Sequence, residues 1–245
     1  MHDPVSLAGD LIRCPSVTPV EGGALDLLRS VLADMGFTCH RLVFSEAGTP
    51  DVDNLYARLG DSGPNFCFAG PSDVVPTGPR HAWSVDPFAA ELRDGVLYGR
   101  GAADMKGFIG CVLAQTPELA ARTLSAPVHL VFSYDEEVGC MGVRRLIDKL
   151  KGMPVKPAMC IVGEPTGMEV VIAPKGKRKI RVKVRGLEMH SSLAPQAVNA
   201  IEYAAELIAF IKGLARRIER DGPFDRMYDL THSTIQVGLI QGGVA

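Results

Sequence analysis

The chain has 245 residues, of which 47% are hydrophobic and 22% are charged. This balance is typical of an ordinary globular protein with a buried core, and it excludes a small disulfide scaffold and a long repeat array. Lys and Arg together number 26 against 28 Asp and Glu, a formal net charge of −2. We therefore expect no nucleic-acid partner. No apolar run approaches the roughly 18 residues of a membrane helix, so we expect no membrane partner either.

Six cysteines are scattered along the chain without any Cys-x-x-Cys pair. They are Cys14, Cys39, Cys67, Cys111, Cys140 and Cys160. Their spacing indicates neither a disulfide framework nor a thiolate zinc site. The first residues show no basic segment followed by an apolar one, so no signal peptide is predicted. We expect free thiols in a reducing cytoplasm.

The first two thirds of the chain alternate helical and extended patterns. Asp3 and Pro4 predict a helix start, and a second amphipathic helix ends at Gly36. The remaining predicted elements are strands 37–43, 54–59 and 65–69, a helix 104–119, strand 128–134, helix 142–151 and strand 158–162. This alternation predicts an α/β fold with a mostly parallel sheet and helices on both faces.

After residue 175 the pattern changes. Residues 177–185 alternate basic and apolar side chains, which predicts a half-exposed strand, and 233–240 predict another. Between them a long helix places Ile201, Ala205 and Ile208 on one side. We therefore expect two domains, 1–175 and a smaller α+β domain over 176–245.

Acidic residues follow three successive predicted strands. Asp73 comes after 65–69, Glu136 and Glu137 after 128–134, and Glu164 after 158–162, while Asp104 begins a predicted helix. The ligand crevice of an open α/β sheet lies at the carboxyl ends of its strands. Carboxylates that converge there repel one another unless a cation holds them, so the pattern favours a metal site over solvated loop charges. Adjacent Glu136 and Glu137 suit a metal-bound water beside a carboxylate base.

Four motifs occur in a fixed order, and together they carry a family resemblance. They are residues 94–101 (DGVLYGRG), 104–107 (DMKG), 135–137 (DEE) and 163–166 (GEPT). The chain resembles the co-catalytic zinc amidohydrolases, which include acetylornithine deacetylase, succinyl-diaminopimelate desuccinylase and carboxypeptidase G. The resemblance implies a zinc-exopeptidase-like catalytic domain in 1–175 and a partial lid and dimerisation domain in 176–245. A homodimer through the lid domain is implied as well.

Within the family the resemblance is divided. Residues 1 to about 105, with 14–19 (CPSVTP), look most like the desuccinylases, and the rest, with 133–140 and 190–195, looks like acetylornithine deacetylases. This division indicates either a mosaic gene or a drifting ancestor.

The resemblance implies a role for each motif residue. Asp104 would bridge two zinc ions, Glu137 would complete one site and Glu164 the other. Glu136 would be the general base, and Asp73 would orient a metal-binding histidine. His190 would steady the developing oxyanion, often across a dimer.

Two departures from the family pattern affect the metal ligands. The family has His-x-Asp where this chain has Pro71, Ser72 and Asp73, and proline has no side-chain donor atom. The family also has a metal-binding histidine at a position far beyond residue 245. The remaining oxygen ligands, Asp104, Glu137 and Glu164, suit harder cations than zinc, so we expect weakened zinc sites that admit Co²⁺, Mn²⁺ or Mg²⁺.

Two functions of different class follow. The first is metal-assisted hydrolysis of a small N-acyl amino acid, with N-acetyl-L-ornithine (arginine biosynthesis) as the leading substrate and succinyl-diaminopimelate (lysine biosynthesis) as the alternative. The second is an inactive fragment that keeps part of the fold. Glu136 favours an enzyme, whereas Pro71 favours the inactive fragment.

Overall fold

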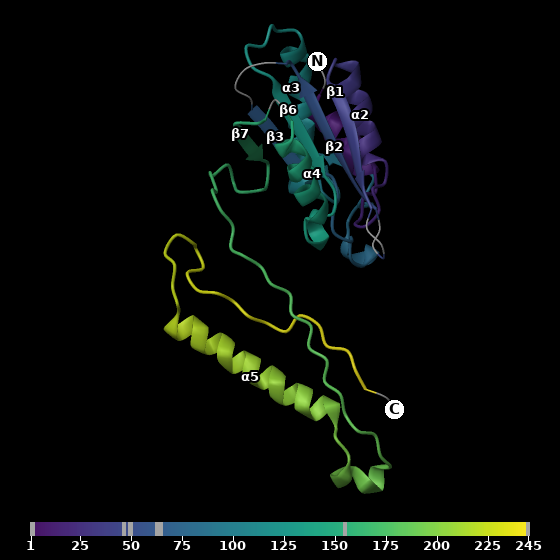
Figure 1. The fold of residues 1–245 in the computed structure, drawn as a ribbon. Coiled ribbons are helices and arrows are strands. Elements are labelled where there is room, and N and C mark those ends of the chain that lie inside the picture. Colours follow the sequence, from purple (N-terminus) through teal and green to yellow (C-terminus); the bar gives the residue numbers. More distant parts are fainter. Residues whose placement is uncertain (1–2, 46–47, 49–50, 62–65, 154–155, 244–245) are drawn as a thin grey trace. The chain divides into compact units, whose positions relative to one another are not determined.

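The computed structural model describes residues 3–45, 48, 51–61, 66–153 and 156–243. These form two compact units, Met1–Ile172 and Ala173–Ala245. Figure 1 shows the helices and strands of both. The catalytic role expected for 1–175 and the lid role expected for 176–245 stay predictions.

The first unit is built on a five-stranded sheet. Its strands are β1 (Thr38–Phe44), β2 (Val52–Leu59), β3 (Phe66–Pro71), β6 (Val128–Ser133) and β7 (Met159–Val162), in the order β1-β2-β6-β3-β7. β2 is antiparallel to β1 and to β6, whereas β6, β3 and β7 are parallel to one another. Four strands therefore run in one direction and only β2 runs in the other, which confirms the predicted mostly parallel sheet.

Helices cover both faces of this sheet (Figure 1). On one face lie α1 (Pro4–Arg13), α2 (Ala24–Asp34) and α3 (Gly107–Ala120), and on the other lies α4 (Met141–Lys151). Alternate residues of a strand point to opposite faces, so Leu55 and Ala57 of β2 enter the first core while Tyr56 enters the second. Each fully buried leucine of the first core contributes roughly 2 kcal/mol to stability.

The strands and helices predicted for residues 3–162 are present, with small shifts at their ends. Asn65, the first residue of a predicted strand, lies outside the described residues. A hairpin of β4 (Glu91–Arg93) and β5 (Val96–Tyr98) was not predicted. Its turn consists of Asp94 and Gly95, both with positive φ, the Asp-Gly combination that a tight hairpin turn requires.

The helix predicted to begin at Asp104 begins three residues later, at Gly107. Asp104 and Met105 have non-helical backbone angles within a turn at Ala102–Lys106 (η2). Gly101 has φ +83° before this turn, and the Lys106 N–H donates to its carbonyl at 2.8 Å. The prediction was wrong because this local turn, and not a helix cap, determines where α3 starts.

In the second unit the predicted helix is present as α5 (Ala200–Asp221), but the two predicted strands are not formed in the described part, 173–243. The β-bridges described in this unit, Leu187 with Val198 and Phe224 with His232, lie outside both predicted segments. An extended segment becomes a strand only when a neighbour accepts and donates its backbone hydrogen bonds, and sequence alternation does not supply that neighbour.

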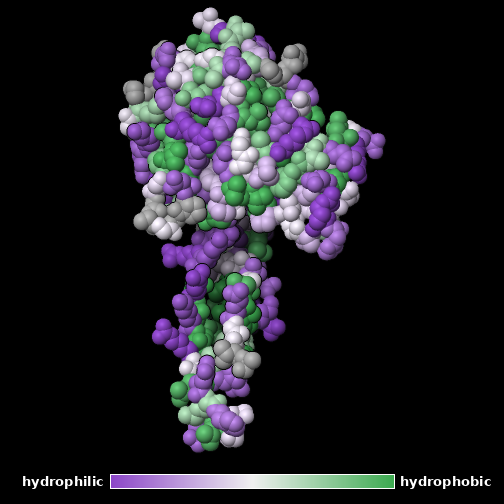
Figure 2. Space-filling model, turned by 90° about the vertical axis from the view of Figure 1, so that its right-hand side faces the viewer, coloured by the Kyte–Doolittle hydropathy of each residue, from purple (hydrophilic) through white to green (hydrophobic). Residues whose placement is uncertain are grey.

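Apolar side chains of the second unit lie at its surface. Ile201 is 54% exposed and Phe210 66% exposed, both on α5. Figure 2 shows hydrophobic side chains at the surface alongside hydrophilic ones. Among the helices of the described residues, none is both long enough and apolar enough to cross a lipid bilayer.

Lys106 fastens the turn before α3 to the end of α1. Its side chain is 1% exposed, and its Nζ donates to the carbonyls of Leu11 and Cys14, each at 2.8 Å. Burial lowers the pKa of Lys106 to about 8. The ammonium group satisfies carbonyls that the end of a helix leaves without partners.

We expect Lys106→Met to lower the free energy of unfolding by about 3 kcal/mol, because two buried carbonyls lose a charged donor. Urea unfolding monitored by circular dichroism measures the change. Lys151→Met is the matched control, since the Lys151 ammonium group is exposed in its 2.8 Å ion pair with Asp148. A control loss as large as that of Lys106→Met would contradict the role of the buried contacts.

Candidate active site

The carboxyl ends of β3, β6 and β7 bring five of the six predicted site residues together. Asp73 follows β3, Glu136 and Glu137 follow β6, and Glu164 follows β7. Asp104 joins them from the turn before α3. Neighbouring carboxylates lie close enough to contribute to the raised pKa values of Glu137 and Glu164. The predicted convergence of acidic side chains is therefore present in the fold, while the role of each residue stays a prediction.

Asp73 is the buried member of the group, with 3% of its surface exposed. Its Oδ1 accepts the N–H of Glu136 at 3.2 Å, and its Oδ2 accepts the N–H of Glu137 at 3.4 Å. Burial raises the pKa of Asp73, and the two N–H groups offset part of that rise. The Asp73 carboxylate thus positions the backbone that carries the two glutamates.

The flanking backbone of Asp73 is held on both sides. Ser72 donates its N–H to the Ser133 carbonyl at 2.8 Å, and Val74 donates to the Ser16 carbonyl at 2.9 Å. The Ser16 hydroxyl donates to the Ser72 carbonyl at 2.6 Å. These bonds join the segment after β3 to the end of β6 and to the loop after α1, so Asp73 has little freedom to move.

Glu136 and Glu137 lie in a short 3₁₀ helix, η3 (Glu136–Val138), between β6 and α4. The preceding Asp135 has φ +82°, in the left-handed region, which turns the chain away from the sheet. Its carboxylate accepts the N–H groups of Met141 and Gly142, each at 3.1 Å. Asp135 therefore caps α4, and the two glutamates occupy the turn between two carboxylate anchors.

Glu164 lies beside Asp104. Burial raises the pKa of Glu164, and the neighbouring Asp104, Glu136 and Glu137 carboxylates raise it further, as does a hydrogen bond to Asp104. The backbone before Glu164 is held by the Gly163 N–H, which donates to the Ala69 carbonyl at 3.4 Å. Gly163 packs on the Phe108 ring so closely that an added Cβ would lie 2.0 Å from it.

The pKa of Glu137 is raised as well, first by burial and then by the neighbouring carboxylates of Glu136, Asp73 and Asp104. Arg100 lowers the pKa of Glu137. The Arg100 guanidinium lies over the Trp83 ring, 5.2 Å from its centroid, and donates to the Pro76 carbonyl at 3.4 Å. Arg100 is the cation of this site that our sequence reasoning missed. The signal was its place in the motif 94–101, which was interpreted only as a family marker.

The residues present do not form a metal site as they lie. Among the residues that the structure describes, no three His, Cys, Asp or Glu side chains are placed to hold one ion. Pro71, at the end of β3, contributes no donor atom where an imidazole would be needed. The raised pKa values of Glu137 and Glu164 show a concentration of negative charge, which favours a cation electrostatically but does not supply its ligand geometry.

His190, the sixth predicted residue, lies in the second unit at the start of a short 3₁₀ helix, η4 (Ser191–Gln196). Its Nδ1 is 2.8 Å from the Ser192 hydroxyl oxygen and accepts the Ser192 N–H at 3.3 Å. These contacts fit a capping residue, and the predicted oxyanion role of His190 stays a prediction.

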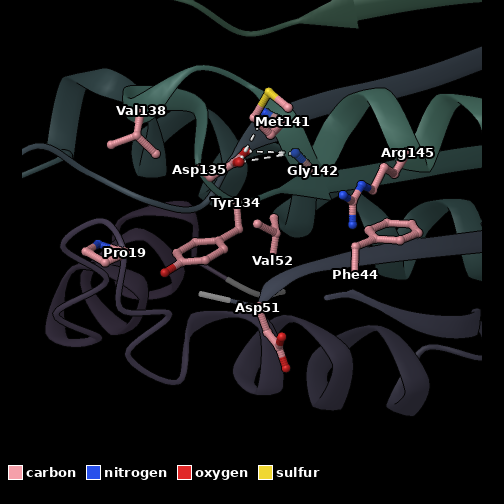
Figure 3. A pocket seen from close by; sticks show the side chains of 10 residues that line it. All are labelled: Pro19, Phe44, Asp51, Val52, Tyr134, Asp135, Val138, Met141, Gly142 and Arg145. Atoms are coloured by element: carbon pink, nitrogen blue, oxygen red, sulfur yellow. Dashed lines mark hydrogen bonds between the residues drawn. The ribbon is translucent and has the colours of Figure 1, made fainter. Parts of the chain in front are cut away.

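A cavity of about 240 Å³ lies next to the turn that contains η3 in the first unit. Asp73, Asp104, Glu136, Glu137 and Glu164 do not line it. Figure 3 shows Tyr134 and Val52 in its middle, between Pro19 on one side and Phe44 on the other. The Tyr134 hydroxyl is buried without a hydrogen-bond partner. The lining is mostly apolar, and of its two carboxylates, Asp51 and Asp135, the second is occupied in capping α4.

Comparison with known proteins finds a match between residues 67–233 and the model of peptidase family M20/M25/M40. Succinyl-diaminopimelate desuccinylase of Rhodospirillum centenum is 46% identical over 214 residues, covering 84% of this chain and 55% of the relative. That of Parvibaculum lavamentivorans is 45% identical over 213 residues, covering 84% of this chain and 54% of the relative. That of Methylorubrum populi is 40% identical over 246 residues, covering 97% of this chain and 63% of the relative.

The chain thus spans little more than half the length of the first two relatives. The sequence resemblance limited the likeness to desuccinylases to about the first 105 residues. The matches to desuccinylases extend well beyond that point.

Solved structures share the fold. An M20 family metallo-carboxypeptidase from Sulfolobus solfataricus matches with a TM-score of 0.58 at 21% identity, covering 66% of this chain and 37% of that one. Human carnosine dipeptidase 1 also matches with a TM-score of 0.58, at 22% identity, covering 65% of this chain and 38% of that one. At this level of identity the likeness concerns the fold alone.

We expect Asp73→Ala to speed hydrogen exchange of the Glu136 and Glu137 amides about tenfold, because both lose their acceptor. Exchange measured by mass spectrometry on peptides that contain residues 136–137 tests this. Asp86→Ala is the control, since the exposed Asp86 carboxylate accepts only the nearby Phe88 N–H. Unchanged exchange in Asp73→Ala would show that these two bonds do not hold the loop.

Burial of Glu164 together with carboxylate repulsion at the site predicts a pH-dependent stability. The pKa of Glu164 is above its ordinary value of 4.5, so the folded chain binds this proton more tightly than the unfolded chain. Ionised Glu164 therefore destabilises the fold at neutral pH, and this penalty disappears as the pH falls to 4.5 and below.

We expect Glu164→Gln to raise stability by a few tenths to about 1 kcal/mol at pH 7.5 in the presence of a chelator, with the gain vanishing in acid. Thermal unfolding across this pH range measures the gain. The control Glu169→Gln changes an exposed glutamate on the same segment. A gain in stability that does not depend on pH, or that is equally large in Glu169→Gln, would contradict a penalty from ionised Glu164.

Proposed function

Because the chain belongs to peptidase family M20/M25/M40, we propose that it carries the first catalytic part of an amide hydrolase of the succinyl-diaminopimelate desuccinylase type. The observation that supports this most is the meeting of Asp73, Asp104, Glu136, Glu137 and Glu164 at the carboxyl ends of β3, β6 and β7. Such a group of carboxylates suits proton transfer at an amide and the binding of a cation.

We propose succinyl-diaminopimelate as the substrate. The sequence resemblance favoured N-acetyl-L-ornithine, but the relatives at 40–46% identity carry the desuccinylase name, so that choice is corrected here. The lysine pathway accordingly replaces the arginine pathway. The proposed substrate remains a small N-acyl amino acid.

In this proposal Glu136 is the general base. It takes a proton from the attacking water and later delivers it to the leaving amine, so that the amide bond breaks to an acid and an amine. Asp73 positions Glu136 through the backbone N–H bond at 3.2 Å. We retain His190 as the proposed stabiliser of the oxyanion, supplied by a lid domain that also forms a homodimer.

Asp104, Glu137 and Glu164 are the proposed ligands of divalent cations, which are zinc ions by the family resemblance, with Co²⁺ or Mn²⁺ as alternatives here. When bound, a divalent cation would polarise the amide carbonyl and the attacking water. Since the described residues contain no three-ligand group, further donors are needed, and a histidine in place of Pro71 would supply one. The six unpaired cysteines support the proposal of a reducing, cytoplasmic location.

Pro71 also supports a second candidate function of another class, an inactive member of the family. Proline leaves the end of β3 without the imidazole that would complete one cation site, so the fold would persist without hydrolysis. The two candidates differ in whether the chain with Pro71 hydrolyses a substrate.

We expect Pro71→His to raise the hydrolysis rate at least about tenfold, because it restores one ligand donor. The variant is made in a chimera in which this chain is continued by the remaining part of the Rhodospirillum centenum desuccinylase. Release of succinate from succinyl-diaminopimelate is measured with Zn²⁺, Co²⁺ or Mn²⁺, and acetylornithine is assayed in parallel.

Two further variants serve as controls for this assay. Glu136→Gln should lower the rate about 100-fold or more, whereas Glu118→Gln, an exposed change on α3, should leave it unchanged. Faster hydrolysis of acetylornithine would refute the substrate, and full activity of Glu136→Gln would refute the base. If neither the chimera with Pro71 nor its Pro71→His variant hydrolyses either substrate, the inactive candidate is favoured.

A further inference from the structure

Two cysteines lie opposite each other on neighbouring strands. Cys67 of β3 and Cys160 of β7 are register partners in the parallel pair, and these two strands lie side by side in Figure 1. Register partners on adjacent strands project from the same face of a sheet. Their Cα atoms are separated by roughly 5 Å in this arrangement, which lies within the range that a disulfide spans.

The two thiols differ in environment. Cys67 is buried, with 2% of its surface exposed, in the core that α4 covers, whereas Cys160 is exposed on the edge strand. A hydrogen bond joins the two side chains; it lowers the pKa of the Cys160 thiol and raises that of Cys67. Cys160 is thus an accessible thiol that is readily ionised, with a second thiol immediately behind it.

The other cysteines lack this arrangement. Cys111 is exposed and Cys14, Cys39 and Cys140 are half-buried, and no register pair of the described strands joins any of them to another cysteine. Exposure alone therefore does not distinguish Cys160 from Cys111. The distinguishing feature is the partner thiol on β3.

We propose that Cys160 and Cys67 form a peroxide-sensitive thiol pair, in which Cys160 is the attacking residue and Cys67 the resolving residue. The Cys160 thiolate attacks one oxygen of hydrogen peroxide, so that an S–O bond forms, the O–O bond breaks and the released hydroxide leaves as water. The Cys67 sulfur then attacks the Cys160 sulfur, so that an S–S bond forms, the S–O bond breaks and the hydroxyl group leaves as a second water with the Cys67 thiol proton. The two thiols are oxidised by two electrons, and the peroxide is reduced.

The bond would fasten the edge strand β7 to β3. Cys160 precedes Glu164 by four residues, and Cys67 precedes Pro71 by four, so both strands lead directly into the carboxylate group. The disulfide would therefore restrain the two strand ends that carry Asp73 and Glu164. The proposal depends on the strand register and on the exposure of the two cysteines, and not on the proposed amide hydrolysis.

The test uses the unmodified 245-residue chain, treated with a small excess of hydrogen peroxide under native conditions and then alkylated and digested with trypsin. The sequence places Cys67 in peptide 59–80 and Cys160 in peptide 152–175, each as the only cysteine. We expect a linked pair of these peptides that is lighter than their sum by two hydrogen atoms. We also expect iodoacetamide to label Cys160 about tenfold faster than Cys111 before oxidation.

Three variants identify the order of the steps. In Cys67→Ser, dimedone should trap a sulfenic acid on Cys160, and no linked peptide should form. Cys160→Ser should abolish the link without a sulfenic acid on Cys67, and the matched control Cys111→Ser should leave the link intact. Circular dichroism confirms that each variant is folded.

Three results would overturn the proposal. The first is oxidation of Cys111 while peptides 59–80 and 152–175 stay unlinked in the unmodified chain. The second is a link that forms only between two chains, as shown by its dependence on protein concentration. The third is equal alkylation of Cys160 and Cys111. Since these readings come from the unmodified chain, they decide the proposal even if a variant fails to fold.

Discussion

The carboxylate of Asp73 accepts the amide hydrogens of Glu136 and Glu137, and the rest of the site depends on this contact. It joins the segment after β3 to the segment after β6, two strands that are neighbours in the sheet. A buried carboxylate is costly without such donors, and two amides without an acceptor would be costly as well. Each group therefore satisfies the other, and the two glutamates are held at the strand ends.

That arrangement concentrates negative charge. Asp104 and Glu136 contribute to the raised pKa values of Glu137 and Glu164, and Arg100 beside Glu137 compensates only part of the effect there. Like charges stay together only because the backbone holds them there, through Asp73, through the turn at Gly101 and through Gly163 packed on Phe108. The clustered carboxylates lower the stability of the fold at the site where the hydrolysis is proposed, and perturbed pKa values of this kind are common at functional sites.

The edge of the sheet shows a second consequence of strand order. Among the strands of the described residues, β7 pairs only with β3, and its residues are exposed on both faces. One of them, Cys160, is thereby open to solvent while its register partner Cys67 remains buried. The difference in reactivity between the two thiols arises from the position of their strands, because nothing in the local sequence around either cysteine distinguishes it.

The sequence by itself determined the five strands of the main sheet and the helices of the first unit, apart from the start of α3, since hydrophobic period, Pro4 and Gly36 act locally. It did not determine the hairpin of β4 and β5. It also predicted that acidic residues gather at strand ends, and that Pro71 removes a donor. Only the tertiary structure decided which backbone groups Asp73 holds, that Arg100 lies beside Glu137, and that 177–185 and 233–240 form no strands. Those features depend on contacts between distant residues, which local patterns do not specify.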